Sequence, residues 1–202
     1  MRKALVLWLL TVPVAALAQA PVPGPAPEST VHRHLGFYLH LDIGVGYLSS
    51  SPSQPAGASS ASGAALPFSF VIGGAVAEDW ILAADLWAAS GPSPSGSSWG
   101  NTASGGLGFN VTHYFMPANV YVSLTPSFTS LVFNTNQGYQ NFADRAATGF
   151  GVKLGLGKEW WVTGHWGLGL CGWYAFSFNP EGNGAGTWRT FSGGLAFSAT
   201  FN

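Results

Sequence analysis

The chain has few charged residues and little cysteine. Asp, Glu, Lys and Arg make up 7% of its 202 residues, whereas soluble domains average about 25%. The basic residues form no patch that could bind nucleic acid. Cys171 is the single cysteine, which excludes an internal disulfide and a metal site built from cysteines. We therefore predict no nucleic-acid partner, no bound metal and no other cofactor.

Long apolar runs are missing as well. Although 47% of the residues are hydrophobic, no stretch after the N-terminal segment is apolar over the roughly 20 residues that a membrane-spanning helix needs. Glycine is abundant instead, with 28 residues. High apolar content, few charges and no long apolar run together favour a membrane β-barrel, in which lipid-facing and lumen-facing residues alternate along each strand.

Residues 1–20 have the three parts of a secretory signal peptide. Arg2 and Lys3 form a basic region, an apolar core follows, and residues 18–20 (AQA) fit an A-x-A cleavage site. Cleavage after residue 20 would place a proline first, so cleavage two residues earlier is the alternative. An uncleaved anchor is disfavoured, because the apolar run is shorter than the roughly 20 residues of a spanning helix. We expect the segment to be removed during export through the inner membrane.

Residues 21–34 are expected to form a proline-rich periplasmic leader. The first ten read PVPGPAPEST, and prolines cannot donate hydrogen bonds to a β-ladder. His32 and His34 are spaced so that both could touch one metal, but no further ligand accompanies them. We expect this pair to be a solvated approach to the first strand.

Eight segments show the period of two that is typical of a β-strand with one apolar and one polar face. In the last segment, Phe191, Leu195 and Phe197 alternate with small or weakly polar residues. The expected strands cover about residues 36–48, 67–77, 80–90, 105–115, 120–129, 148–162, 166–178 and 188–202.

The connections between these segments alternate between long and short. Long loops rich in Ser, Gly, Ala, Pro or Asn are expected at residues 49–66, 91–104, 134–147 and 179–187, and short turns at residues 78–79, 116–119 and 163–165. Bacterial outer-membrane barrels have an even number of strands, short periplasmic turns and long outer loops. Pairing of the last strand with the first would also remove the free sheet edge.

The predicted fold is therefore all-β, an eight-stranded antiparallel up-and-down transmembrane β-barrel over residues 35–202 in the cell outer membrane. A soluble β-sandwich or a lipocalin is the alternative, but either would bury its apolar face and carry charges on the other, and this chain has few.

Aromatic residues gather beside the three short turns, where an interfacial girdle is expected. The predicted girdle consists of Trp80, Tyr114, Phe115, Tyr121, Trp160, Trp161 and Trp166. Its position indicates that the short turns lie at one surface of the membrane.

Inward-facing ionisable residues form the candidate functional group, a polar cluster in the lumen. Its members are His40, Asp42, Asp85 and Lys153. The interior of an eight-stranded barrel is just wide enough for side chains to fill it, so buried charges there are expected to pair. One interpretation is a structural polar plug, in which Lys153 bridges Asp42 or Asp85. The other is a narrow path lined by these groups. Inward glycines could leave a small void or make room for large rings projecting from other strands.

Three segments carry a family resemblance: HYFMPANVYVS (113–123), GKEWWVTGHWGLGL (157–170) and GGLAFSATF (193–201). Over about residues 35–202 the chain resembles the small eight-stranded outer-membrane barrels of Gram-negative bacteria, loosely the OmpW, OmpX and OmpA-barrel group. The second segment is similar to a stretch of uncharacterised outer-membrane barrel proteins, which implies a family without a settled activity.

The resemblance also implies partners, namely outer-membrane lipid and the outer-membrane assembly machinery. Such barrels usually end in an aromatic residue that this machinery is thought to read. Here the pattern lies one residue early, because Phe201 precedes Asn202. The implied assembly signal consists of Leu195, Phe197 and Phe201.

For function, we expect an integral outer-membrane barrel with a structural role or a narrow passage for small solutes. The alternative is a surface-interaction barrel of the adhesin type, whose outer loops would contact a ligand that the residues do not identify. An enzyme is not expected. Lipid-A deacylases of this size resemble one another in a His-x-Ser pair on a membrane-facing strand, and neither His113 nor His165 has a serine at that spacing. Omptin-like proteases need more strands. We assign no catalytic residue.

Overall fold

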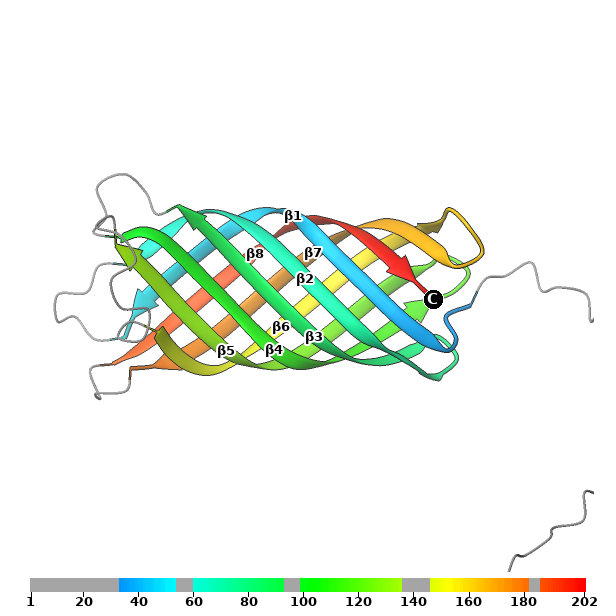
Figure 1. Cartoon of the computed structure of the whole chain (residues 1–202), viewed down its shortest axis with the longest axis horizontal. Coiled ribbons are helices and arrows are strands. Elements are labelled where there is room, and N and C mark those ends of the chain that lie inside the picture. Colours follow the sequence, from blue (N-terminus) through cyan, green and yellow to red (C-terminus); the bar gives the residue numbers. More distant parts are fainter. Residues whose placement is uncertain (1–32, 54–59, 93–98, 136–145, 182–185) are drawn as a thin grey trace, which may run out of the picture. The chain divides into compact units, whose positions relative to one another are not determined.

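A computed structural model describes residues 33–53, 60–92, 99–135, 146–181 and 186–202, all within one compact unit, Val31–Asn202. The expected signal peptide, most of the leader and parts of the long loops lie outside the described residues. In chain order the strands are β1 (Phe37–Pro52), β2 (Ala61–Ala77), β3 (Trp80–Pro92), β4 (Trp99–Phe115), β5 (Val120–Thr135), β6 (Ala146–Trp161), β7 (Trp166–Pro180) and β8 (Thr187–Phe201) (Figure 1). Within the described part, no helix has the length and apolar character to cross a membrane.

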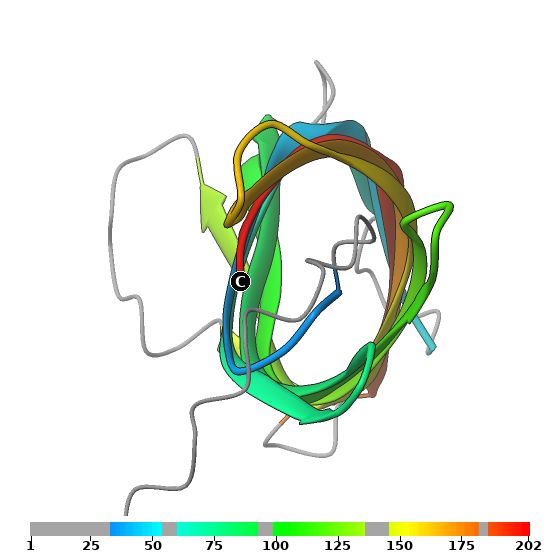
Figure 2. The same ribbon diagram turned by 90° about the vertical axis from the view of Figure 1, so that its right-hand side faces the viewer.

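The eight strands close into one antiparallel barrel (Figure 2). Each strand pairs with its neighbours in the sequence, and β8 pairs with β1 from Leu39↔Phe201 to Pro52↔Trp188. The last strand therefore has no free edge. The predicted up-and-down barrel is confirmed, and the chain end and the start of β1 lie at the same end as the short turns.

Most strands are longer than the sequence pattern indicated, and the predicted loop bounds are too wide. β1 continues to Pro52, β2 begins at Ala61 and β4 begins at Trp99. These extensions are rich in Ser, Gly and Ala and show little apolar alternation, yet their backbones stay paired with the neighbouring strands. The strands have 13 to 17 residues, whereas a tilted strand crosses a bilayer with about 9–11. The barrel therefore extends beyond the membrane on the long-loop side.

The outer surface of the barrel carries a broad apolar band. On β1, Phe37, Ile43, Val45 and Tyr47 are all exposed, and Ser49 and Ser51 follow on the same face. A strand rise of about 3.3 Å and a tilt of about 40° give about 2.5 Å along the barrel axis for each residue. Phe37 and Tyr47 are thus about 25 Å apart along the axis, which is the height of the lipid-facing band of such barrels.

Four of the seven predicted girdle residues lie on the outer face beside the short turns, namely Trp80, Phe115, Trp160 and Trp166. The prediction is wrong for the other three. Tyr114 and Tyr121 are 1% and 3% exposed. Both point into the barrel, because the two faces alternate along a strand and each tyrosine is next to an outward residue. Trp161 turns toward the barrel opening, where its ring centroid lies 5.1 Å from that of His34.

Side chains fill the interior along its length. Aromatic residues occupy the short-turn half, and an apolar cluster fills the long-loop end, consisting of Ala61, Leu131, Phe133, Ala147 and Trp188. The inward glycine Gly157 makes room for a ring, since a Cβ there would lie 2.5 Å from the phenol ring of Tyr121. Of the two roles expected for inward glycines, Gly157 has the second, because it makes room for a large ring.

Candidate functional site in the barrel interior

The structure places all four predicted lumen residues inside the barrel, but in two separate groups. His40 and Asp42 come from β1, Asp85 from β3 and Lys153 from β6. Strand parity explains their direction, because each lies between two outward apolar residues. Asp85 is fully buried and Lys153 is 5% exposed.

The first group is an ion pair across the lumen. Lys153 Nζ lies 2.7 Å from Asp85 Oδ2 and donates a hydrogen bond of 2.7 Å to Ser69. Ser69 donates to one oxygen of Asp85, and Thr125 donates to the other. The pair and its hydrogen-bond donors thus join β2, β3, β5 and β6. Of the two acids expected as partners of Lys153, Asp85 is the one that forms the ion pair. A buried carboxylate with this many donors is well compensated for the water it has lost.

The second group is centred on His40. Its Nε2–H donates to Asp42 Oδ1 at 2.9 Å, and its Nδ1 lies 2.7 Å from Thr200 Oγ1. The Thr200 hydroxyl donates its hydrogen to Glu159 Oε1 at 2.6 Å. It therefore acts as the acceptor for the Nδ1–H of His40. Both ring nitrogens therefore carry a hydrogen, and His40 is a cation between two carboxylates. Tyr114 also donates to Glu159, at 3.3 Å.

Glu159 is the member of this group that the sequence reasoning missed. It is 1% exposed and its Oε1 lies 3.4 Å from His40 Nδ1. The signal was present, because the inward positions 149, 151, 153, 155 and 157 of the expected sixth strand continue at 159.

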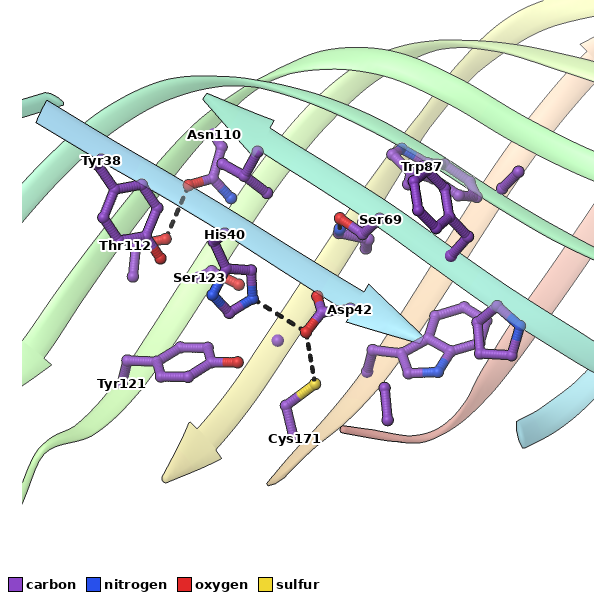
Figure 3. A pocket seen from close by; sticks show the side chains of 18 residues that line it. Tyr38, His40, Asp42, Ser69, Trp87, Asn110, Thr112, Tyr121, Ser123 and Cys171 are labelled. Carbon is purple, nitrogen blue, oxygen red and sulfur yellow. Dashed lines mark hydrogen bonds and ion pairs between the residues drawn. The ribbon is translucent and has the colours of Figure 1, made fainter. Parts of the chain in front are cut away.

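A small cavity lies beside His40 and Asp42, and Figure 3 shows the side chains that line it. Its volume is ≈ 30 Å³, and its lining includes Asp42, Lys153, Trp173 and Cys171. The Cys171 thiol donates to Asp42 Oδ1 at 3.5 Å. One ordered water needs about 10–15 Å³ of such space, so the cavity has the size for one or two waters.

His34 closes the short-turn end, where the sequence predicted a solvated segment. That prediction is wrong for His34, which is fully buried. Its Nε2–H donates to Asn119 Oδ1 at 2.9 Å, its backbone N–H donates to Asp79 Oδ1 at 3.2 Å, and its ring stacks on Tyr114 with centroids 3.5 Å apart. In Figure 2 the segment before β1 crosses the barrel opening.

The two turn residues that hold His34 have an uncommon backbone conformation. Asp79 has a φ of 62° and Asn119 a φ of 51°, the left-handed region that Asn and Asp tolerate better than most residues. This conformation turns both side chains toward His34 in the opening. Burial is the main reason why the pKa of His34 is lowered from its usual value of 6.5. The neutral imidazole accepts a hydrogen bond from Asn202 Nδ2 at 3.2 Å.

Asn202 thereby links the chain end to the leader. Its Oδ1 accepts from the backbone N–H of Leu35 at 2.9 Å, and its backbone N–H donates to the carbonyl of His165 at 3.0 Å. The residue that interrupts the expected terminal aromatic signal thus has structural contacts of its own.

No protein-family model matches the chain, and no curated protein matches it. Among solved structures, the chain is similar to Neisserial surface protein A, with a TM-score of 0.54 and 19% identity over 82% of this chain and 96% of that one. It is also similar to the outer membrane protein AlkL, with a TM-score of 0.51 and 12% identity over 89% of this chain and 96% of that one.

These likenesses concern the fold. The chain has the fold of the small eight-stranded outer-membrane β-barrels. Its apolar outer band and closed sheet are those of an outer-membrane protein.

Proposed function

We propose that the protein is an integral outer-membrane β-barrel with a structural role, whose interior is closed to solutes. The observation that carries this proposal is the Lys153–Asp85 ion pair, which crosses the lumen from β6 to β3. The two strands are separated by β4 and β5 in the barrel wall, so the pair spans the interior and does not merely line one side.

Two further closures support the proposal. At the short-turn end, the hydroxyls of Tyr38 and Tyr114 are hydrogen-bonded at 2.9 Å beneath His34. At the long-loop end, the rings of Phe133 and Trp188 meet across the lumen with centroids 4.6 Å apart. Packed apolar side chains exclude water and ions, because an ion would have to lose its hydration to pass them.

A narrow passage for small solutes is the second candidate. The cavity beside Asp42 favours it, because polar groups line that cavity and its ≈ 30 Å³ can hold water. The long loops, on which an adhesin-like role would depend, extend into residues outside the described part. We assign no catalytic step to the interior groups.

Planar-bilayer conductance of the refolded protein distinguishes the two candidates. We expect no discrete current steps from the native protein or from Lys153→Ala, because the two end closures remain in both. Current steps in the native protein that change in size or ion selectivity in Lys153→Ala would contradict the closed barrel and support a passage. A shift between boiled and unboiled samples on a cold SDS gel confirms that each sample is folded.

We further infer that Leu195, Phe197 and Phe201 act as the signal that the assembly machinery reads. Leu195 and Phe197 are exposed on the outer face of β8, where another protein can contact them during insertion. If Phe201→Ala blocks assembly in cells and deletion of Asn202 does not, the signal lies one residue before the chain end. Equal assembly of native protein and Phe201→Ala would contradict this assignment.

A further inference from the structure

Arg189 is an exposed cation on the outer face of β8, at the long-loop end of the apolar band. It is two residues from the exposed Phe191, and it pairs in register with Phe178 of β7 and Ser51 of β1. Among the described residues it forms no ion pair. Its exposed guanidinium, which has no such partner in the described part of the chain, is therefore available to a ligand from outside the barrel.

The height of Arg189 matches that of lipid headgroups. It is twelve residues along β8 from Phe201, whose ring packs on the interfacial Trp166 with centroids 5.3 Å apart. At about 2.5 Å of axial rise per residue, Arg189 lies about 30 Å from the membrane interface at the short-turn end. The hydrocarbon band of such barrels is about 25 Å tall, so Arg189 lies just beyond it.

An apolar furrow leads up the lipid-facing surface to this arginine. Its volume is ≈ 1030 Å³, and it is lined by outward residues of β2 to β7, which include Leu82, Phe109 and Phe150. Ala84 and Pro126 are among the smaller outward residues of this lining. The furrow reaches Phe178, which is the register partner of Arg189.

We propose that the furrow and Arg189 together bind one phosphate-bearing lipid of the outer leaflet, with an acyl chain in the furrow and the phosphate on the guanidinium. Charge complementarity selects this occupant. An apolar furrow alone would accept any acyl chain, but an exposed arginine at headgroup height favours an anionic group, and its planar fork matches two phosphate oxygens. The inference rests on the proposed membrane location and adds a specific site to it.

The test uses the full-length refolded protein in detergent, with two lipids that share their acyl chains. Phosphatidylglycerol supplies chains and phosphate, and diacylglycerol supplies the chains alone. Native mass spectrometry counts the lipids that each variant retains. Arg189→Ala removes the cation and Ala84→Phe fills the furrow. Arg33→Ala removes an exposed cation from the short-turn end, where it pairs with Glu78, and Ala199→Phe adds a ring to β8, which does not line the furrow.

We expect the native protein, Arg33→Ala and Ala199→Phe to retain one phosphatidylglycerol and little diacylglycerol. Arg189→Ala should weaken retention of phosphatidylglycerol about tenfold, the scale of one lost charge-assisted hydrogen bond. Ala84→Phe should weaken retention of both lipids. Inorganic phosphate added alone should not bind, since it lacks the chain.

Equal retention of phosphatidylglycerol by native protein and Arg189→Ala would overturn the site, as would an equal loss in Arg33→Ala. Failure of the membrane proposal is seen separately, because a protein that is not a folded barrel shows no shift on a cold SDS gel in any variant.

Discussion

Removal of one partner from the lumen ion pair is the most direct test of how the interior is stabilised. Lys153→Met keeps a side chain of similar length and removes the ammonium group, whereas Asp85→Asn keeps the shape of the acid and removes its charge. The two changes differ in what they leave behind. Asp85 is fully buried, while Lys153 lines the ≈ 30 Å³ cavity that Asp42 also lines. An orphaned Lys153 can therefore meet water and a second carboxylate, and an orphaned Asp85 cannot.

The loss in unfolding free energy should follow this difference. Removing one partner of a buried ion pair costs about 3–5 kcal/mol, and we expect Lys153→Met to fall in that range. Asp85→Asn should cost less, about 1–3 kcal/mol, because the Lys153 ammonium still donates to Ser69 and still lines the cavity, where it can meet water. The double variant should cost less than the two single changes together, with a coupling of about 1–3 kcal/mol.

Urea unfolding of the refolded protein in lipid vesicles, followed by tryptophan fluorescence, measures these losses. With a slope of about 3 kcal/mol per M of urea, Lys153→Met should lower the unfolding midpoint by more than about 1 M. Ser130→Ala, a small change on the outer face of β5, is the matched control and should shift stability by less than about 0.5 kcal/mol.

A loss of unfolding free energy below about 1 kcal/mol in Lys153→Met would refute this account, because a loss of that size is typical of a solvent-exposed ion pair. Strict additivity of the two single changes would refute it as well, because residues in direct contact should couple.

Three further outcomes follow from the interior packing. His34→Gln should loosen the short-turn end, seen as faster hydrogen exchange at the Leu35 amide. Because burial lowers the pKa of His34, the unfolded chain binds the proton at a higher pH than the folded one. Its contribution to stability is thus present above the usual 6.5 and falls as the pH drops below that value. The native protein should lose more stability than His34→Gln between pH 7.5 and 5.5, and equal losses would contradict the neutral imidazole. Gly157→Ala should cost about 1–3 kcal/mol in urea unfolding through overpacking against Tyr121, whereas Gly164→Ala, with nothing within 4 Å, should be near neutral.

Strand direction and face were predictable at single-residue level wherever large apolar residues alternate with polar ones. Asp85 and Lys153 were placed inside for this reason, and both lie there. The same rule places Tyr114 and Tyr121 inside. Their assignment to the girdle rested on their nearness to a turn, and strand parity is the better guide to the face on which a side chain lies. Parity also identifies Glu159, once the sixth strand is continued past residue 157.

His34 shows where local patterns stop being informative. Its neighbours contain no alternation, and its partners Asp79, Asn119 and Asn202 are 45, 85 and 168 residues away in the sequence. Only the closed barrel brings those residues to one opening. The strand extensions were missed for a related reason, because a backbone ladder beyond the membrane needs no apolar face and leaves no periodic signal.

The sequence by itself therefore determined the class of fold, the number of strands and the face on which most side chains lie, because a period of two is a property of each strand alone. The tertiary structure decided which side chains meet inside. The pairing of Lys153 with Asp85, the position of His40 between Asp42 and Glu159, and the link from Asn202 to His34 all depend on how the strands are staggered when β8 closes on β1. That stagger is set by the register of the whole ladder, which no single strand encodes.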